Sequence, residues 1–348
     1  MHFGSSIIEG DAKWDGDLRF TGEFRYTKGY WEWTQDVLSR CGDRLRHLKI
    51  YDAVYASLFS YDHNSDIVKA FCEAWCPLTN TLLTSAREMS ISLWDLHELV
   101  GLPMTGCLYD EVVPRALELT GVDEKREIFS SFHTFKMASL MANGRRVNLA
   151  IPVLASIYEG LNTVATFPKP AGTRHSFPIH FVYAWLACYF KTHYSVWQEL
   201  RGPKMTRFSR EGGAKYYEPR KARKRIHKAE FVSWACNMLV KDGPFKFVDD
   251  GRAEELNHSY FVAIRSSYLT LRQGGRFIIE PYSPHRFGRQ FGYYQDVPGT
   301  LRYDTRVASL EEGLRYWRLC VLSKSSSKAW FPCLPANAKK LCSEVYKT

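Results

Sequence analysis

Hydrophobic residues recur at intervals of three and four positions along most of this chain, which is the spacing of one helix face. Strict alternation, typical of a strand, occurs over 89–92, and the one convincing strand of the second half is expected at 276–280. The pattern therefore predicts many helices and few strands. Helices are expected at about 33–41, 51–59, 68–75, 93–100, 114–121, 128–139, 153–164, 182–190, 229–240, 253–271, 310–322 and 336–346.

The densest set of local signals lies in the stretch 71–106. Pro77 should end one helix, because proline lacks an amide donor. A β-prone run followed by an alternating run predicts a hairpin over 79–92. Ser92 and Asp95 have the spacing of a capping box that begins the next helix. We expect one shared core here, formed by Trp75, Ile91, Leu93, Leu96 and Leu99.

These elements predict a mainly α fold: a single multi-helix domain with a small β-hairpin and one or two further short strands. Residues 1–24 are rich in Gly, Asp and Ser and show no periodicity, which predicts a flexible N-terminal tail. The domain should then run over 25–346. In its second half, Ser176 is expected to cap a helix that has Pro178 in its first turn.

The composition fits a folded domain of the cytosol or nucleus. Hydrophobic residues make up 45% and aromatic residues 15% of the 348 residues, which excludes wholesale disorder. The net charge of +10 favours a polyanionic partner, a nuclear setting or simple solubility. Nine scattered cysteines in apolar surroundings favour reduced thiols. The polar, acidic start predicts no secretory signal, and the apolar run 177–190 is too short to span a bilayer.

Most of the positive charge is concentrated in one segment, 204–228. Ten Lys and Arg side chains stand there against two Glu side chains, a net charge of +8. Glycines and a proline interrupt the segment, so we expect an exposed basic loop over about 201–228. Three interpretations stay open: a nuclear-import signal, a nucleic-acid patch, or a solvated loop without a partner. The candidate residues are Arg220, Lys221, Arg223, Lys224, Arg225 and Lys228.

A second candidate patch interleaves basic and aromatic residues: Arg286, Phe287, Arg289 and Phe291. Exposed rings in such a pattern bind single-stranded nucleic acid. The same pattern also occurs where the rings pack into the core and the arginines hydrogen-bond to carbonyl groups. We favour this structural interpretation, because Gly288 permits the tight chain path that it needs.

Residues that could perform chemistry are sparse. Cys72 and Cys76 lie near His63 and His97, but no C-x-x-C pair accompanies them, so core thiols are favoured over a zinc site. The sequence contains no phosphate-loop, dinucleotide or nucleophile-elbow motif. Its acidic residues are too dispersed to nominate a nuclease triad. We therefore expect a protein that is not an enzyme and uses no cofactor or metal.

Four ordered segments carry a family resemblance. They are F-C-x-x-W-C-P at 71–77, E-M-S-I-S-L-x-D at 88–95, G-L-P-x-x-G at 101–106 and Y-x-P-x-R-x-x-R-Q-F-G at 282–292. From about residue 28 to near 340, the chain resembles the plant mobile domain family, also called the aminotransferase-like plant mobile domain. The aminotransferase label would imply a lysine Schiff base and a phosphate cup. No lysine here lies beside a glycine-rich phosphate loop, so we interpret the label as historical.

The resemblance implies a nuclear protein of a family found both in plant retroelements and in host genes. Host members are linked to transposon silencing, genome stability and gene expression, and some act with a phosphoprotein phosphatase. A non-catalytic, protein-binding scaffold is therefore the expected function. The alternative is a sequence-tolerant nucleic-acid-binding protein derived from a retroelement. A hydrolase or transferase comes third.

Overall fold

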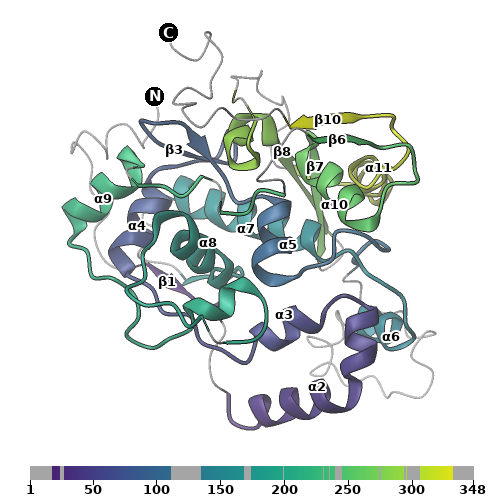
Figure 1. The fold of residues 1–348 in the computed structure, drawn as a ribbon, viewed down its shortest axis with the longest axis horizontal. Helices are drawn as coiled ribbons and strands as arrows, with labels where there is room; N and C mark the ends of the chain where they lie inside the picture. Colours follow the sequence, from purple (N-terminus) through teal and green to yellow (C-terminus); the bar gives the residue numbers. More distant parts are fainter. Residues whose placement is uncertain are drawn as a thin grey trace.

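The structure is a computed structural model, and it describes residues 18–23, 27–110, 135–167, 174–198, 200–229, 231–234, 236–239, 245–273, 276–293, 295 and 306–331. The fold is mainly α with small sheets, as predicted (Figure 1). Its α-helices are α2 (Tyr30–His47), α3 (Tyr51–Ala56), α4 (Ser65–Glu73), α5 (Leu93–Val100), α6 (Phe135–Ala142), α7 (Ala150–Thr166), α8 (His180–Phe190), α9 (Pro219–Lys228), α10 (Glu255–Ile264) and α11 (Leu310–Cys320). Two 3₁₀ helices join them, η4 (Lys204–Phe208) and η5 (Pro284–Phe291).

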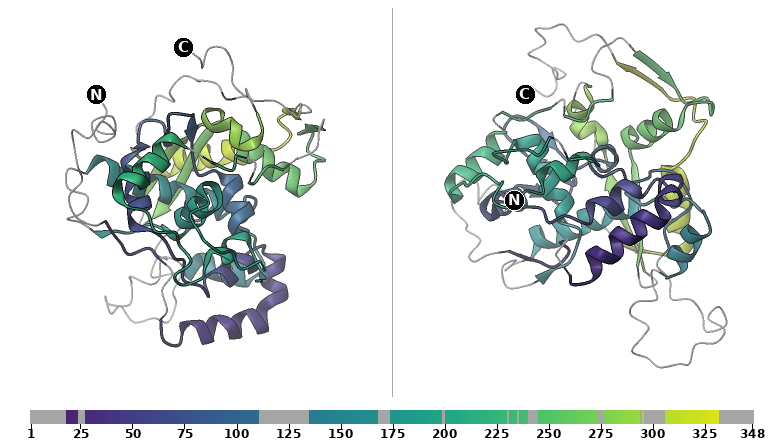
Figure 2. Two further views of the ribbon diagram at one scale, coloured as in Figure 1. Left: turned by 60° about the vertical axis from the view of Figure 1, so that its left-hand side comes forward. Right: turned by 60° about the horizontal axis from the view of Figure 1, so that its bottom comes forward.

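The strands are short and form small sheets. In chain order they are β1 (Arg19–Phe20), β2 (Trp75–Cys76), β3 (Thr81–Leu83), β4 (Glu88–Met89), β5 (Arg174–His175), β6 (Phe245–Val248), β7 (Ser267–Gln273), β8 (Arg276–Tyr282), β9 (Arg306–Ala308) and β10 (Lys328–Phe331). Strands β2, β3 and β4 form one antiparallel sheet, and β7, β8 and β9 form another. The β6–β10 ribbon stands out from the body of the molecule (Figure 2).

The main core lies among α4, α5, α7 and α8. Ten of the eleven residues of α8 are buried, as expected for a helix that is apolar on every side. The five side chains expected to share a core all belong to it, which confirms that prediction. A smaller cluster packs α2 against α3 and is formed by Leu38, Leu45, Leu48 and Ile50. None of the helices within the described ranges is both long and apolar enough to cross a membrane.

The predicted hairpin is present as β3 and β4, with Leu82 opposite Met89. Strand β2 adds a third member that the sequence did not predict, because α4 ends at Glu73, before the expected end at Trp75. The predicted capping box of Ser92 begins α5, with the serine oxygen accepting from the Asp95 amide at 3.0 Å.

Residues 18–23 correct the prediction of a flexible tail over 1–24. Strand β1 pairs in parallel with β5, and the Phe20 ring is buried, 5.6 Å from the ring of Phe177. Burial of the Phe20 ring orders this segment although Gly and Asp are frequent around it. Residues 1–17 lie outside the described residues.

Two predicted helices in the second half are wrong in part or in whole. Helix α10 ends at Ile264, and the rest of the expected helix is strand β7, whose Leu269 and Leu271 point into the core. The described residues of 229–240 form turns, because Ala229 and Phe231 have positive φ angles of 47° and 61°. Both departures come from contacts or conformations that helical spacing does not encode.

Other predicted boundaries also shift. Helix α8 begins at His180 after a helical Ile179, so Ser176 is not its cap. Strands β7 and β9 flank the predicted strand β8, giving more strands than expected. The helices expected at 153–164 and 310–322 are confirmed as α7 and α11. The helices predicted at 114–121 and 336–346, and the first part of 128–139, lie outside the described residues.

Buried histidines predict acid sensitivity. Burial lowers the pKa of His180 from 6.5 to about 3, although the Gly22 carbonyl, 3.0 Å from Nδ1, opposes this. Between these pH values the unfolded chain binds a proton that the folded chain does not. The free energy of unfolding should therefore fall as the pH drops below 6.5, by at most about 1.4 kcal/mol per pH unit for this group. Urea unfolding at several pH values measures that slope.

His180→Asn keeps a donor for the Gly22 carbonyl and should make the slope shallower. His47→Asn, at an exposed position of α2, is the matched control for the loss of one histidine. Burial also lowers the pKa values of His193 and His258, so part of the slope should remain. Identical slopes for the wild type and His180→Asn would show that this histidine is not the source.

Candidate functional site

The family motifs meet in space although they lie 200 positions apart in the chain. The Ser90 amide donates to Gln290 Oε1, and Gln290 Nε2 donates back to the Ser90 carbonyl, both at 2.8 Å. The glutamine side chain thereby pairs with the backbone as a neighbouring strand would. Beside it, Arg286 donates to Glu88 Oε1 at 2.9 Å. These bonds fasten η5 to the end of the hairpin.

A second buried network joins the hairpin to α7 and β8. Asn80 Nδ2 and Asn162 Nδ2 both donate to Glu280 Oε2, at 3.0 and 3.1 Å. Asn162 Nδ2 also donates to Asn80 Oδ1, and its own Oδ1 accepts from Trp75 Nε1, both at 2.8 Å. Glu280 is fully buried, so these amide donors replace the water that it loses. The network therefore stabilises the packing of the hairpin against α7 and β8.

Asp95 is the most heavily bonded motif residue, and it too is buried. Its Oδ1 accepts from Tyr189 Oη at 2.7 Å and from Asn237 Nδ2 at 2.8 Å. Its Oδ2 accepts from the Ser92 amide at 2.9 Å, the Ser92 hydroxyl at 2.7 Å and Trp185 Nε1 at 3.3 Å. Burial raises the pKa of Asp95, and the bonds from Asn237, Ser92 and Tyr189 oppose that rise. The carboxylate ties α5 to α8.

The second sequence-predicted patch is part of the same core. Phe287 and Phe291 are buried, so their rings are not available for stacking on bases. Arg286 is buried beside Glu88, and the Arg289 guanidinium lies 4.3 Å from the centre of the Trp234 ring. The burial of the two rings confirms that part of the structural interpretation, and the arginines contact a carboxylate and an aromatic ring.

The first sequence-predicted patch is not a loop, which corrects the prediction for 201–228. Residues 204–208 form η4, and 219–228 form helix α9, which begins with Pro219 at a first-turn position. Ala222 and Ile226 are fully buried against α4, so α9 belongs to the folded body. This i, i+4 apolar pair is the sequence signal for the helix, and the surrounding charge obscured it.

Among the candidate residues of this patch, Arg223 and Arg225 contact other elements of the fold. Arg223 forms a bidentate pair with Glu73 of α4, with Nε–Oε2 at 2.7 Å and Nη2–Oε1 at 2.8 Å. The Glu73 side chain is only 3% exposed. Arg225 donates to the Phe190 carbonyl at the end of α8, and its guanidinium lies 5.3 Å from the Tyr217 ring. Both arginines hold α9 in place.

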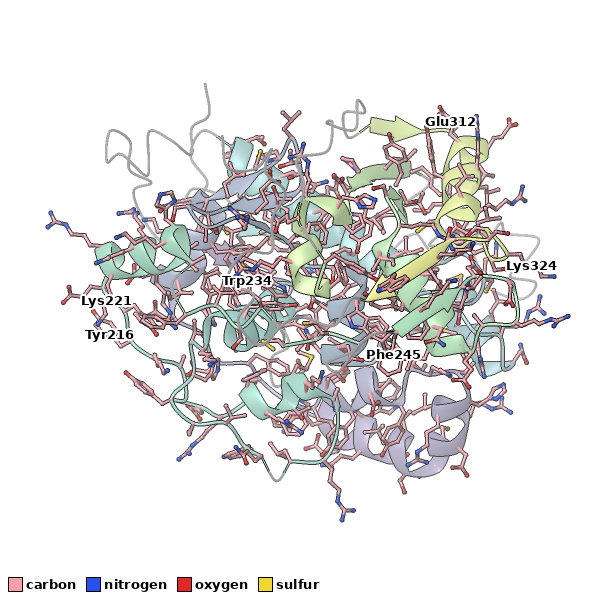
Figure 3. The ribbon with its side chains drawn as sticks, turned by 45° about the horizontal axis from the view of Figure 1, so that its top comes forward. Tyr216, Lys221, Trp234, Phe245, Glu312 and Lys324 are labelled. Carbon is pink, nitrogen blue, oxygen red and sulfur yellow. The ribbon has the colours of Figure 1, made fainter. Side chains whose placement is uncertain are left out.

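The other four candidates face outward and form what we call the basic strip: Arg220, Lys221, Lys224 and Lys228. Figure 3 shows Lys221 at one edge of the molecule, with Tyr216 nearby. Arg220, Lys221 and Lys224 make no ion pair within the described part of the chain. A helix face of this kind presents its charge to solvent or to an acidic partner.

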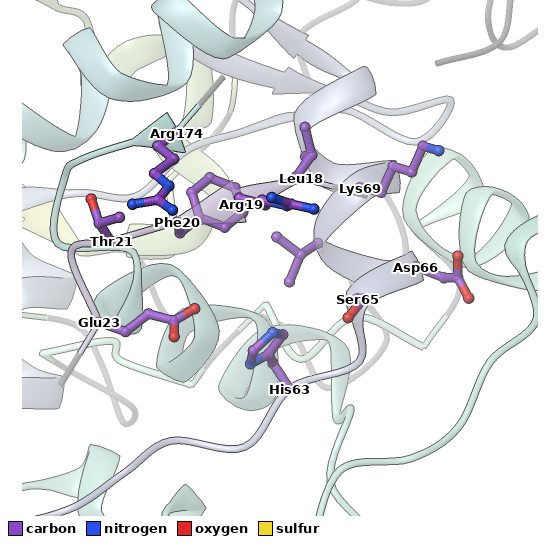
Figure 4. Close-up of a pocket in the computed structure, with 11 residues that line it drawn as sticks. Leu18, Arg19, Phe20, Thr21, Glu23, His63, Ser65, Asp66, Lys69 and Arg174 are labelled. Carbon is purple, nitrogen blue, oxygen red and sulfur yellow. The ribbon is translucent and has the colours of Figure 1, made fainter. Parts of the chain in front are cut away.

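One cavity, of about 460 Å³, lies between β1 and the start of α4 (Figure 4). Its lining includes three cationic side chains, Arg19, Lys69 and Arg174, and two carboxylates, Glu23 and Asp66. The opposite charges largely cancel, so this cavity does not extend the positive field of the basic strip.

A second cavity, of about 440 Å³, is lined in part by the G-L-P-x-x-G motif. Burial raises the pKa of Asp52 there. Burial alone would raise the pKa of Glu255 too, but Lys49 at 2.6 Å and Arg146 at 3.2 Å hold that pKa below its usual value. Opposite shifts of this kind are typical of acid–base pairs. Because the Glu255 oxygens already bind two cations and the Thr105 hydroxyl, we interpret this group as a clamp between α10 and the motif loop.

The cysteines considered for a metal site lie in different elements. Cys72 is in α4 and Cys76 in β2, and both are buried, which raises the pKa of the Cys72 thiol. Among the residues that the structure describes, no three His, Cys, Asp or Glu side chains gather in a group that could hold a metal ion. Metal analysis of the native protein is the remaining test of the core-thiol prediction.

Comparison with known proteins bears on the family. The model of the plant mobile domain matches residues 123–318, which is more than half of the chain and includes α6 to α10, most of α11 and the motif at 282–292. Searches of curated proteins and of solved structures found no match. The chain therefore belongs to the plant mobile domain family.

Proposed function

We propose that this plant mobile domain protein is a non-catalytic scaffold that works in the nucleus and binds an acidic protein surface through the basic strip of α9. A phosphoprotein phosphatase is the partner that the family resemblance suggests. Transposon silencing, genome stability and gene expression are the processes in which such a scaffold would act.

The engagement of the motif side chains supports a role without catalysis. Asp95, Glu280 and Gln290 are buried and hydrogen-bonded to protein groups. A catalytic group must reach a substrate, and these groups instead join elements that are distant in sequence. These motif side chains therefore serve the fold, which supports placing the function on the surface.

The single observation that carries the proposal is the outward face of α9. It presents four cationic side chains on a helix whose other face is fixed in the core. Rigid placement lowers the entropic cost of binding, and clustered charge steers an acidic partner to the site. An import receptor would meet the same exposed face, although the packed helix is not the flexible segment that the sequence suggested.

Affinity purification from nuclease-treated plant nuclei tests the proposal. The strip variant carries Arg220→Gln, Lys221→Gln and Lys224→Gln, which remove charge and no buried contact. The matched control removes three exposed charges near α11 with Arg315→Gln, Arg318→Gln and Lys328→Gln. We expect the wild type and the control to retain the same proteins and to accumulate in nuclei, and the strip variant to lose both properties.

Two results would overturn the proposal. The strip variant could retain every nuclease-resistant partner, which would make the strip a solvated surface. Alternatively, nuclease treatment could remove all partners from the wild type, which would favour the nucleic-acid-binding alternative over a protein scaffold.

A further inference from the structure

A second exposed surface lies beside the basic strip, and neither the family motifs nor the proposed scaffold function uses it. It consists of two segments, 192–197 after α8 and 207–216 before α9. The Tyr194 amide donates to the Gly213 carbonyl at 2.8 Å, and the Trp197 amide donates to the Arg207 carbonyl at 3.1 Å. His193 bridges Ala214 in antiparallel fashion. These bonds place the two segments side by side.

Three large aromatic side chains of these segments are exposed to solvent. Tyr194 is 66% exposed, Tyr216 is 71% exposed and Trp197 is 43% exposed. The Tyr216 amide donates to Tyr194 Oη at 3.3 Å, which holds one ring next to the base of the other. A cavity of about 520 Å³, lined by Val196, Trp197, Gln198 and Leu200, adjoins the third ring.

The exposure does not come from a loosely attached loop. Ala214 donates its amide to Asp62 Oδ2 at 2.8 Å, and the buried His193 ring lies 5.4 Å from the Phe208 ring. The second segment is therefore anchored to the body through Ala214 and through Phe208, which packs against the main core, and the first segment is held against the second. Rings held in this way lose little side-chain entropy when a ligand packs on them.

Positive charge surrounds the three rings. Arg207 and Arg210 are exposed on the second segment, and Arg210 donates to Ser195 Oγ of the first segment at 3.0 Å. Only three residues separate Tyr216 from Arg220, so the surface continues into the basic strip. Glu211 and Glu218 are the acidic residues of 201–228. The result is a rigid set of rings along a positively charged track.

We propose that this surface binds single-stranded nucleic acid without reading its sequence. Bases would stack on Tyr194, Trp197 and Tyr216, and phosphates would pair with Arg207, Arg210 and the basic strip. Stacking needs an open base face, which a single strand offers and a duplex hides, whereas charge alone attracts both. The rings therefore confer the preference for single strands. This binding goes beyond the scaffold function, because it depends on the three rings, which the strip variant leaves unchanged.

Fluorescence polarisation with a labelled oligothymidylate of about 20 nucleotides and a duplex of equal length tests this on the full chain. The ring variant carries Tyr194→Ala, Trp197→Ala and Tyr216→Ala. Its matched control removes three exposed rings elsewhere, with Trp33→Ala, Phe245→Ala and Trp330→Ala. We expect the wild type and the control to bind the single strand at least about tenfold more tightly than the duplex, and the ring variant to bind it about 100-fold more weakly.

Salt dependence separates the rings from the arginines. The ring variant should keep the wild-type slope of log affinity against log salt, because it loses no phosphate contact. Arg207→Gln with Arg210→Gln should reduce the slope by about 1.4, at about 0.7 per contact on a single strand. Equal affinity for duplex and single strand, or a ring variant that binds like the wild type, would overturn the proposal. The proposal would also fail if the wild type bound no oligonucleotide and the ring variant lost a nuclease-resistant protein in affinity purification. The rings would then bind a protein partner.

Discussion

Replacing Asp95 by asparagine is expected to lower the free energy of unfolding by about 3 kcal/mol. Every partner of this carboxylate donates a hydrogen bond to it. An amide at the same position must turn its nitrogen toward one pair of donors. On one side stand the Ser92 and Trp185 N–H groups, which cannot become acceptors, and on the other stands the Asn237 side chain, which can present its oxygen only by flipping and giving up its bond from Lys204. Either orientation therefore leaves a buried donor or the Lys204 ammonium with a lost bond.

Urea unfolding of Asp95→Asn measures the effect, with Asp43→Asn as the matched control. Asp43 is fully exposed and forms an ion pair with Arg46, and an exposed pair of this kind contributes little stability. The control should therefore unfold at the wild-type midpoint. If Asp95→Asn also unfolded there, the carboxylate would not join α5 to α8 as the distances indicate.

Arg223→Gln is expected to cost about 3–5 kcal/mol, because it leaves the buried Glu73 carboxylate without its bidentate partner. The strip variant removes three charges from the same helix and should unfold at the wild-type midpoint. The contrast separates the structural arginines of α9 from the exposed ones. In the exposed loop predicted from the sequence, neither change would affect folding.

A double variant distinguishes the ion pair from a general loss of arginine packing. Glu73→Gln in the Arg223→Gln background removes the unpaired charge and should recover part of the lost stability. Arg223→Lys keeps the charge but not the planar fork, so an intermediate loss is expected. Equal stability of Arg223→Gln and the strip variant would show that the Glu73 contact contributes nothing.

Elements whose stabilising contacts lie within a few residues of each other could be predicted from the sequence. The capping box predicted at Ser92 forms, since its hydrogen bonds close within three residues, and a box of the same spacing begins α11 at Ser309. The hairpin and the apolar stripe of α8 also follow from nearby residues. The motif segments identified the family before any contact between them was known.

Contacts between distant segments could not be predicted in the same way. Nothing near Gln290 indicates that it pairs with the Ser90 backbone. Helix α9 was missed because only Ala222 and Ile226 mark its buried face, and the partner of Arg223 lies 150 positions away. The exposed rings beside α9 were missed for the opposite reason, since aromatic residues in a sequence normally indicate a core.

We propose that the motifs build the fold while the basic strip makes the functional contact. The measurement that decides this is the dissociation constant of the purified chain for the most abundant nuclease-resistant partner, at about 50 mM and about 200 mM salt. We expect binding about tenfold weaker for the strip variant at low salt, a smaller difference at high salt, and wild-type affinity for the α11 control. Equal dissociation constants for the wild type and the strip variant would contradict it.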